Sequence, residues 1–386
     1  MTSFIHAYTL TSAVGTGLEG LRQALAANQG GLVAAEWPDC DVPCYLGPVA
    51  VAEHQPLPAD RASRNNRLVA LALEQDDFAA QVRAACEQWG SDRVGLVMGT
   101  STSSIDRAEA AYRQLDTSDH FPASYQQPEV HNPHAPGDLA AELLGIDGPR
   151  LTVSVACASS AKVFATADRW LRQGLVDAVV VGGADSLCLS VIYGFASLQL
   201  VAPEPCRPFS PDRQGISLGE AAGFALLSRE ADEAAVTLLG CGESCDAYHM
   251  SSAHPEGLGA RLAMERALSS AGLSAAAIDY LNLHGTGTRA NDSTEGLVCA
   301  DVLTARTVMS ATKGWTGHTL GAAGIVEAVF CFEALTQGRL AGTRNTKTFD
   351  ADINLLLDTE ARSIDTAMTN SFGFGGNNCS LIFGRP

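Results

Sequence analysis

The stretch LTVSVACASSAKVFATADRWLRQG (residues 151–174) changes its residue pattern at Cys157, and this change indicates the class of fold. Residues 151–156 are apolar and rich in Val and Thr, which is typical of a buried strand. Residues 158–173 repeat apolar side chains at helical spacing, and Gly174 is a typical helix stop. A thiol between a strand and a helix lies near the positive end of the helix dipole, which favours the thiolate. The pattern therefore predicts a strand–turn–helix unit with a candidate nucleophile at its turn.

Similar apolar runs alternate with helical stretches along the chain. They are RVGLVMGT, LTVSVA, DAVVVGG, AGFALLS, IDYLNLHG, RTVMSA and CSLIFG. Alternation of this kind predicts an α/β fold in which helices are layered on buried sheets. The charged stretch SREADEAA separates two strand signals, and we place the midpoint of the fold there, between residues 1–230 and residues 231–386.

Two segments on either side of this midpoint resemble each other. GLVMGTST (95–102) and LNLHGTGT (281–288) each lead an apolar run into Gly-Thr-x-Thr, and they occupy comparable places in their halves. A repeat of this kind is consistent with an internal duplication of one α/β unit.

Composition limits the classes of function. Of 386 residues, 46% are hydrophobic and 18% are charged, which is typical of a soluble enzyme and not of a disordered chain. The net charge of −18 argues against non-specific binding of nucleic acid, because the phosphate backbone would be repelled. The sequence shows no secretory signal and no apolar stretch of membrane-spanning length. We therefore expect a cytoplasmic protein without a membrane segment, whose eleven cysteines are mostly small buried side chains.

Neither a metal nor a nicotinamide cofactor is expected. The pairs Cys40/Cys44 and Cys241/Cys245 lack the CxxC spacing, and neither has a second pair in zinc-binding register. The glycines of VVVGGADS end a strand but lack the GxGxxG spacing of a dinucleotide site.

Three glycine-rich stretches carry the remaining candidate groups. LHGTGTRANDSTE places His284 at the end of a strand, and SATKGWTGHTLGAAG places Lys313 and His318 five residues apart ahead of a helix. The third stretch, NSFGFGGNN, predicts a loop with left-handed backbone conformations. Taken singly, each stretch is also consistent with a structural turn, a structural histidine or a surface lysine.

Together, and in this order along nearly the whole chain, the motifs resemble those of the β-ketoacyl-[acyl-carrier-protein] synthases of the thiolase superfamily. RPFSPDRQGISLGEAAG (207–223) also resembles the signature RPFDxxRDGFxxGEGAG of that family. The resemblance implies a five-layer α-β-α-β-α fold of two duplicated halves, usually in a dimer whose partner subunit closes the acyl pocket. It implies a decarboxylative Claisen condensation that needs no cofactor, in which Cys157 accepts an acyl chain and the carbanion from a malonyl-carrier protein attacks it.

The resemblance also implies a role for each group. His284 and His318 would donate hydrogen bonds to the enolate oxygen, and the backbone N–H groups of Cys157 and Phe374 would hold the oxyanion of the acyl transfer. Lys313 is expected to pair with Glu295 and to order the histidines. The Phe374 side chain resembles the gate that admits the acyl chain.

Two surfaces follow from the same resemblance. Arg61, Arg64 and Arg67, at the start of an amphipathic helix, and Arg207 are candidates for docking an acyl carrier protein; an ordinary solvated face explains them equally well. Ser103, Ser104 and Ile105 lie in the region that lines the acyl pocket of the family.

Departures from the family pattern leave alternatives open. Ser160 and Ala222 replace usual glycines, and Asn377 stands where a Thr is usual. A non-catalytic, chain-length-determining subunit of the same fold would typically lack the nucleophilic Cys. A thiolase would need a second catalytic Cys, and Cys379 does not precede glycines. Whether the chain serves fatty-acid or polyketide and polyene elongation, and as a homodimer or a heterodimer, is left open by the sequence.

Overall fold

The structure, a computed structural model, describes residues 2–50, 55–116, 119–125, 127, 129–232 and 234–386. Its main strands are β1 (Ser3–Ser12), β5 (Val94–Gly99), β6 (Arg150–Val153), β7 (Ala178–Asp185), β9 (Ala221–Ser228), β10 (Val236–Cys245), β11 (Tyr280–Leu283), β12 (Val308–Ala311), β15 (Thr366–Phe372) and β16 (Asn377–Gly384). Short strands are β2 (Gly15–Thr16), β3 (Val33–Ala34), β4 (Tyr45–Gly47), β8 (Leu218–Gly219), β13 (Arg339–Leu340) and β14 (Glu360–Ala361). All seven apolar runs that the sequence analysis predicts as strands form strands.

The helices alternate with these strands, as predicted. They are α1 (Gly17–Ala27), α2 (Arg64–Leu73), α3 (Phe78–Trp89), α4 (Ile105–Tyr112), α5 (Ala135–Leu144), α6 (Ser159–Arg172), α7 (Leu189–Ser197), α8 (Leu258–Ala271), α9 (Arg289–Val302), α10 (Lys313–Thr316) and α11 (Ala323–Gln337). Among the described residues there are also five short 3-10 turns: η2 (Ser91–Arg93), η3 (Ala123–Tyr125), η4 (Ala275–Ala277), η5 (Leu320–Ala322) and η6 (Phe374–Gly376).

The same strand order occurs twice in the central sheet. Its path is β12-β11-β15-β16-β10-β1-β9-β7-β5-β6. The main strands of the first half are β1, β5, β6, β7 and β9, and those of the second half are β10, β11, β12, β15 and β16. From the centre of the sheet outward, the order is β1-β9-β7-β5-β6 on one side and β10-β16-β15-β11-β12 on the other, so each half has its first, fifth, fourth, second and third strand in the same succession. The parallel and antiparallel pairings also agree. The segments 95–102 and 281–288, which resemble each other, run along and beyond β5 and β11, the second strand of each half. The topology therefore matches the internal repeat.

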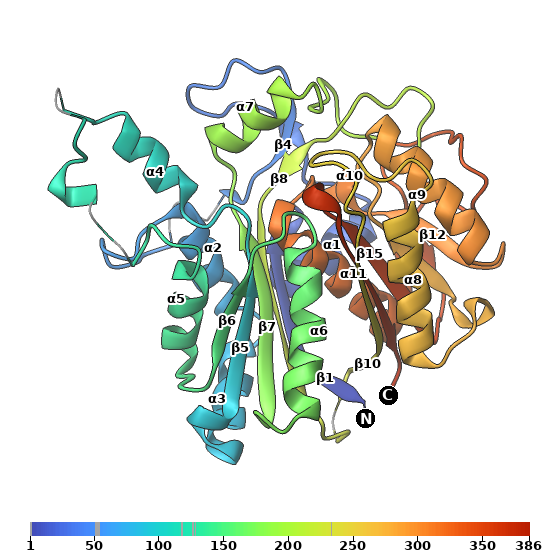
Figure 1. The fold of residues 1–386 in the computed structure, drawn as a ribbon, viewed down its shortest axis with the longest axis horizontal. Helices are drawn as coiled ribbons and strands as arrows, with labels where there is room; N and C mark the ends of the chain where they lie inside the picture. The colour runs from blue at the N-terminus through green and yellow to red at the C-terminus, as the bar shows by residue number, and fades with distance from the viewer. Residues whose placement is uncertain (1, 51–54, 117–118, 126, 128, 233) are drawn as a thin grey trace.

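Helices and sheet form five layers (Figure 1). Helices α6 and α11 pack on each other between the two halves of the sheet, in the largest hydrophobic core. Helices α2, α3 and α5 cover the outer face of the first half, and α8 and α9 cover that of the second. The predicted five-layer α/β fold is confirmed.

The unit around Cys157 differs from its prediction in one respect. Helix α6 forms as expected, and its apolar positions Val163, Ala167 and Leu171 are fully buried. Strand β6, however, is short and lies at the end of the sheet, where β5 is its single partner among the strands that the structure describes. Leu151 is consequently 40% exposed, so the expectation of a fully buried strand is wrong.

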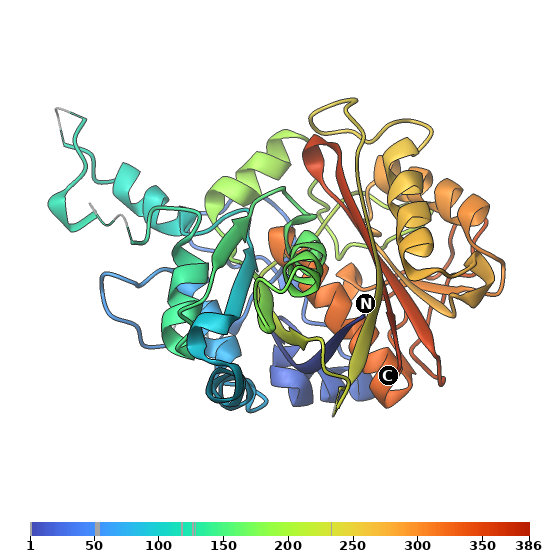
Figure 2. The same cartoon turned by 60° about the horizontal axis from the view of Figure 1, so that its bottom comes forward.

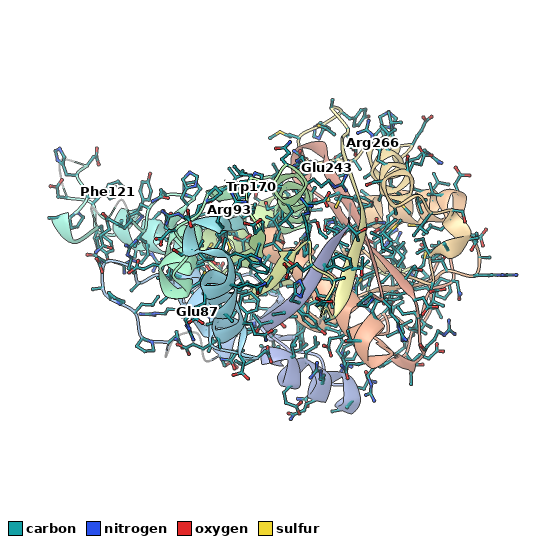
Figure 3. The ribbon with its side chains drawn as sticks, turned by 90° about the horizontal axis from the view of Figure 1, so that it is seen from below. Glu87, Arg93, Phe121, Trp170, Glu243 and Arg266 are labelled. Carbon is teal, nitrogen blue, oxygen red and sulfur yellow. The ribbon has the colours of Figure 1, made fainter. Side chains whose placement is uncertain are left out.

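A segment near β6 extends away from the rest of the molecule in two views (Figures 1 and 2). It contains α4 and η3, and Figure 3 shows Phe121 far from the central sheet. Tyr112 and Phe121 pack edge to face, with ring centroids 5.1 Å apart, although both side chains are substantially exposed. This segment and β6 place exposed apolar groups on one side of the molecule.

One stretch of the described residues is apolar and long enough to cross a membrane, which the sequence analysis did not expect. It is Leu320–Gln337, and 89% of it is buried inside the protein. The stretch comprises η5 and α11, the helix at the centre of the five layers. Its apolar side chains therefore pack in the hydrophobic core of the protein.

Candidate active site

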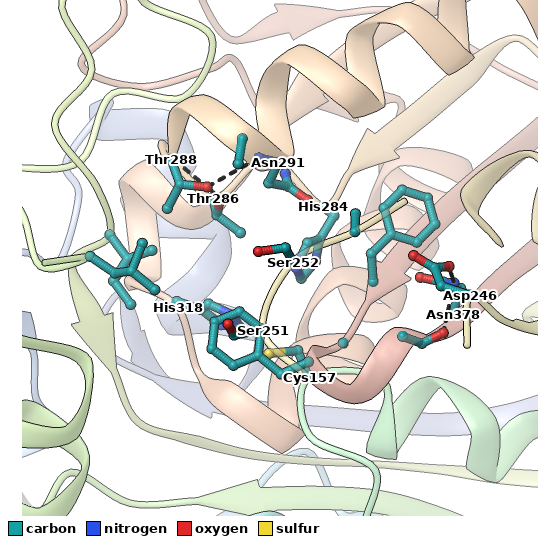
Figure 4. A pocket seen from close by; sticks show the side chains of 18 of the residues that line it. Cys157, Asp246, Ser251, Ser252, His284, Thr286, Thr288, Asn291, His318 and Asn378 are labelled. Atoms are coloured by element: carbon teal, nitrogen blue, oxygen red, sulfur yellow. Dashed lines mark hydrogen bonds between the residues drawn. The ribbon is translucent and has the colours of Figure 1, made fainter. Parts of the chain in front are cut away.

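The candidate catalytic groups meet at one end of the sheet (Figure 4). Cys157 follows β6, His284 follows β11, and Lys313 and His318 both follow β12, so three separate stretches of sequence converge there. The Cys157 sulfur, one ring nitrogen of His284 and one ring nitrogen of His318 lie within 4.8 Å of one another. All three side chains are buried, and they border a cavity of about 100 Å³.

A tight turn presents the Cys157 thiol. Ala156 has a left-handed backbone (φ 52°), which is uncommon for a residue with a Cβ. The Ser159 hydroxyl fixes this turn, because it accepts the Val155 N–H at 2.9 Å and donates to the Ala156 carbonyl at 2.6 Å. The sulfur is therefore held in the turn between β6 and the start of α6, as the sequence predicts.

The protonation of Cys157 differs from the sequence-based expectation. Burial raises the pKa of the thiol to about 11; the Lys313 charge and a hydrogen bond from the Phe374 backbone N–H oppose this rise. Desolvation of the sulfur outweighs the Lys313 charge and the Phe374 hydrogen bond, so the resting group is a thiol and not a thiolate.

This protonation state predicts the alkylation behaviour of Cys157. Since only the thiolate reacts, we expect the rate of carbamidomethylation at Cys157 to rise about tenfold per pH unit between pH 7 and pH 10. Peptide mass spectrometry after iodoacetamide treatment measures this rate, with the exposed Cys245 as an internal comparison. A rate that is already constant below pH 8 would show a depressed pKa and contradict the burial argument.

His284 is fixed through its backbone and its ring. Its N–H and that of Gly285 each donate to one oxygen of the buried Glu295 carboxylate, both at 2.8 Å. The Lys313 ammonium donates to the His284 carbonyl and lies 3.3 Å from Nδ1 of the ring. Because an ammonium only donates, Nδ1 accepts, and we assign the proton of the neutral ring to Nε2.

His318 is held by the stretch that resembles the family signature. Its N–H donates to the Ser217 carbonyl at 2.7 Å, and its carbonyl accepts the Gly219 N–H at 3.0 Å. Nδ1 accepts the Leu320 N–H at 3.2 Å, which again assigns the ring proton to Nε2. The His284 and His318 rings are 5.5 Å apart and nearly perpendicular.

Both imidazoles are neutral at physiological pH. Burial and the Lys313 charge hold the pKa of His284 and of His318 well below the usual value. The neighbouring His318 ring lowers the pKa of His284 further. Two neutral rings with Nε2–H groups form a pair of hydrogen-bond donors that carry no charge.

The predicted partner of Lys313 is wrong. Lys313 forms a buried ion pair with Glu327 of α11, whereas Glu295 accepts the two backbone N–H groups described above. Burial raises the pKa of Glu327 to about 7, against the Lys313 charge, and raises the pKa of Glu295 to about 7 as well. Sequence reasoning missed Glu327. The pattern that could have indicated a buried, paired carboxylate is its position inside the apolar run GIVEAVF, which begins six residues after His318.

The glycine-rich loop lies against the thiol as expected. Gly375 and Gly376 have φ angles of 77° and 75°, which favour glycine. The Gly375 N–H donates to the Met250 carbonyl at 2.8 Å. The Phe374 ring packs against Phe195, with centroids 5.7 Å apart, while its backbone N–H faces the Cys157 sulfur.

Comparison with known families identifies this arrangement. The family model "Beta-ketoacyl synthase, N-terminal domain" matches residues 56–233, and the corresponding C-terminal domain matches residues 235–347. The chain belongs to the β-ketoacyl synthase family.

Individual relatives agree with this family. The chain is 38% identical to a chain of the complex between ketosynthase ApeO and its chain length factor ApeC from Xenorhabdus doucetiae, with a TM-score of 0.89; the match covers 100% of this chain and 98% of that one. It is 33% identical to nodulation protein E of Rhizobium sp. (strain N33) over 316 residues, 78% of each chain. It is 31% identical to 3-oxoacyl-[acyl-carrier-protein] synthase 2 of Staphylococcus aureus over 312 residues, 76% of this chain and 77% of the relative.

The predicted family and activity are thereby confirmed. The protein is a β-ketoacyl-[acyl-carrier-protein] synthase, an acyltransferase that condenses an acyl thioester with malonyl-carrier protein in fatty-acid or type II polyketide elongation.

Three residues predicted to line the acyl pocket of this ketosynthase lie outside the cavity. The Ser103 hydroxyl donates to the Asn132 carbonyl at 2.8 Å, and the Ser104 hydroxyl donates to Ser63 at 2.9 Å. Ile105 is the first residue of α4. The cavity itself is bordered by other apolar groups, among them Phe195, Leu200, Ile216 and Phe372.

The predicted docking arginines differ in their surroundings. Arg64 makes a two-pronged ion pair with the fully buried Glu220, at 2.5 and 2.7 Å, and its guanidinium stacks on Trp37. This internal pair accounts for Arg64 as a structural residue. Arg61 precedes α2 and reaches Glu142 at 3.1 Å, Arg67 is half-buried, and Arg207 pairs with Glu204 and Asp212.

The departures from the family pattern spare the reactive groups. The Ser160 hydroxyl accepts the Ile325 N–H at 3.0 Å and so joins the first turns of α6 and α11. Asn377 contacts Lys162 at 3.4 Å, whereas the neighbouring Asn378 borders the cavity. Ala222 is buried within β9.

Proposed function

We propose that this ketosynthase elongates acyl chains by a ping-pong route in which Cys157 carries the chain and His284 and His318 stabilise the enolate. The observation that supports this most strongly is the approach of the three reactive groups within 4.8 Å at one cavity. A non-catalytic chain-length subunit would not need a thiol at this place.

In the first half-reaction, the Cys157 sulfur attacks the carbonyl carbon of the acyl-carrier thioester. The new S–C bond replaces the bond to the carrier, and the thiol proton passes to the departing carrier thiol. The Phe374 backbone N–H, which faces the sulfur, and the Cys157 N–H at the first turn of α6 are the proposed donors to the oxyanion.

In the second half-reaction, malonyl-carrier protein loses CO₂, and the electron pair moves onto the thioester oxygen as an enolate. The Nε2–H groups of His284 and His318 are the proposed donors to that oxygen. The enolate carbon then attacks the carbonyl carbon of the acyl group, the bond to the Cys157 sulfur breaks, and the sulfur leaves as a thiolate that takes a proton from solvent water. Lys313 holds the ring and carbonyl of His284 in place, and its charge is balanced by Glu327.

A second, ketosynthase-like subunit is proposed to bind along β6. Three observations support this: β6 has one open edge, Leu151 is exposed beside it, and the α4–η3 segment carries exposed aromatic side chains on the same side. The Xenorhabdus doucetiae relative forms a complex with a chain length factor, which favours type II polyketide or polyene elongation by a heterodimer. Ser103, Ser104 and Ile105 are proposed to line the acyl pocket once this subunit is bound.

We also propose that the protein acts in the cytoplasm. We divide the chain into halves of residues 1–230 and 231–386, because the order of strands in the first half, which ends with β9, is repeated in the second half, which begins with β10.

The function is tested with the purified protein, alone and with a candidate partner subunit. Acyl-carrier and malonyl-carrier proteins are supplied together, and the products are followed by mass spectrometry and CO₂ release. We expect one CO₂ per 3-oxoacyl-carrier formed and an acyl adduct on Cys157. Condensation without such an adduct would contradict the ping-pong route.

Carrier docking is proposed for Arg61, Arg67 and Arg207, because the carrier is expected to be acidic and this chain carries a net charge of −18. We expect the double variant Arg61→Glu/Arg67→Glu to lose about tenfold in kcat/KM for acyl-carrier protein at low salt, and less at high salt. Small free thioesters should react unchanged.

Arg64 is left intact in this experiment, because its removal would leave Glu220 buried without its partner. Arg83, exposed on α3, provides the control substitution to Glu. Equal losses on carrier-bound and free thioesters, or no loss on either, would reject docking at this helix.

A further inference from the structure

A buried carboxylate that the proposed mechanism does not use lies at the end of β7. Asp185 is the last residue of this strand and is fully buried. Its two oxygens accept three hydroxyl groups and three backbone N–H groups, at 2.5 to 3.0 Å. The donors are the hydroxyls of Thr100, Ser101 and Thr102 and the N–H groups of Ser101, Thr102 and Gly321. A carboxylate bonded to so many donors fixes their positions relative to one another.

The donors come from two segments that are far apart in the sequence. Residues 100–102 connect β5 to α4, and Gly321 belongs to η5, just before α11. Both segments lead into helices, whose N-terminal N–H groups favour a negative charge. A Cβ at Gly321 would lie 2.6 Å from an Asp185 oxygen, so η5 reaches the carboxylate because residue 321 is a glycine. Asp185 therefore joins the η5 turn to the end of β5.

The turn that Asp185 holds is also the turn that orients His318. The Leu320 N–H donates to Nδ1 of the His318 ring at 3.2 Å. Leu320 has a left-handed backbone (φ 55°), which is uncommon for a residue with a Cβ. The next N–H along the chain, that of Gly321, donates to Asp185 at 2.5 Å. This bond offsets the cost of the left-handed conformation and so keeps the Leu320 N–H directed at the ring.

The direction of the Leu320 N–H decides which nitrogen of His318 carries the proton. A donor at Nδ1 requires a lone pair there, which leaves the proton on Nε2. At His284 the donor to Nδ1 is the charged Lys313 ammonium, whereas at His318 it is a neutral backbone N–H. A neutral donor distinguishes the two tautomers less strongly than a charged one. The tautomer of His318 therefore depends on how firmly its turn is held.

We propose that Asp185 is a positioning residue, which holds the η5 turn and thereby keeps His318 in the Nε2–H tautomer that donates to the enolate. The proposal rests on the function proposed above, because it assigns the enolate step to His318. The turn at Cys157 is fixed separately, through the Ser159 hydroxyl. Acyl transfer to Cys157 should therefore not depend on Asp185.

The first measurement is CO₂ release from malonyl-carrier protein by Cys157→Gln, with and without the further substitution Asp185→Asn. The amide keeps the size of the side chain but turns one acceptor oxygen into an NH₂ group that faces other donors. We expect kcat to fall at least about tenfold and KM to change less than about twofold, because a misdirected donor is lost in the transition state and not in substrate binding. In the protein that retains the thiol, Asp185→Asn should change the rate of Cys157 acylation less than about twofold.

The second measurement reads the tautomer of His318 directly. In protein labelled with nitrogen-15 histidine, two-bond proton–nitrogen spectra distinguish the two tautomers of each ring, and the His318 signals are those missing from His318→Ala. We expect the Nε2–H form in the parent protein and a mixture of both forms in Asp185→Asn. Ser101→Ala is a milder variant that decides the question if Asp185→Asn does not fold, since Ser101 is exposed and its hydroxyl donates to Asp185 at 2.6 Å. It should shift the spectrum in the same direction and lower kcat about threefold.

Glu333→Gln is the matched control for the loss of a buried carboxylate. Glu333 lies toward the other end of α11, where it accepts hydrogen bonds from Tyr8 and Arg22. Its substitution should lower stability and leave both CO₂ release and the His318 spectrum unchanged.

Three results would overturn the role of Asp185. They are unchanged CO₂ release in Asp185→Asn, reduced CO₂ release while His318 keeps the Nε2–H form, and equal losses of CO₂ release and acylation. If the Cys157→Gln parent releases no CO₂, the proposed separation of the two half-reactions fails, and the His318 spectrum alone decides the role of Asp185.

Discussion

Cys157→Ala is expected to abolish both acyl-enzyme formation and condensation. The cavity offers no second thiol among the described residues that border it, so no other group there can form the thioester that Cys157 forms. Intact-protein mass spectrometry after incubation with an acyl-carrier protein measures the adduct directly.

Cys331→Ala is the matched control for this variant, because Cys331 is also fully buried but lies in the core, within α11. Its substitution should lower stability slightly and leave the adduct on Cys157 in place. An acyl chain that maps to another cysteine in the wild-type protein would show that the nucleophile has been assigned wrongly.

Cys157→Gln separates the two half-reactions. The glutamine cannot accept an acyl chain, whereas loss of CO₂ from malonyl-carrier protein needs the imidazole donors and not the thiol. We therefore expect CO₂ release to continue in this variant without any 3-oxoacyl product. A complete loss of CO₂ release would indicate that the sulfur itself takes part in decarboxylation.

Local sequence patterns were sufficient to predict the strands and the turn that carries Cys157. The runs before Cys157 and His284 alternate with helical stretches over short distances, and the turn at Cys157 depends on neighbours such as Ser159. The order of the strands in the sheet could not be predicted from such local patterns. The exposed edge at β6 depends on which strand lies last in the sheet, and periodicity within residues 151–156 carries no information about that.

Charged partners were predicted less well, because they are chosen across long distances in sequence. Arg64, at helical spacing among other arginines, resembles a surface residue, yet its partner Glu220 lies 156 positions away and is fully buried. Lys313 had two acidic candidates on neighbouring helices, and only the packing of α11 beside His284 selects Glu327. The pKa of Cys157 likewise depends on how completely the fold removes water from the sulfur.

Substitution of either histidine is expected to have the second largest effect, and to act on the other half-reaction. His284→Ala and His318→Ala should each reduce malonyl decarboxylation about a hundredfold or more, since each removes one donor to the enolate oxygen. Acylation of Cys157 should be largely spared in both variants. Stopped assays of CO₂ release and of the acyl adduct measure the two steps separately. The control is His120→Ala, because His120 is exposed and does not border the cavity.

The pH dependence of decarboxylation, measured in the Cys157→Gln variant, tests the same role independently. Burial and Lys313 lower the pKa of both imidazoles well below 6.5, so the neutral forms persist as the pH falls through the range in which an exposed histidine would gain its proton. We therefore expect decarboxylation by Cys157→Gln to stay constant from pH 7.5 down to pH 6, instead of falling around pH 6.5.

Lys313→Ala should resemble the histidine variants in decarboxylation but should also lower stability, because it leaves the Glu327 carboxyl buried without its ion-pair partner. The double variant Lys313→Met/Glu327→Gln removes both charges together and separates the two effects. It should recover stability while decarboxylation stays low, because the ring of His284 still lacks the ammonium that holds Nδ1 as an acceptor. Unchanged decarboxylation in both single histidine variants would contradict the enolate role, whatever the lysine variants show.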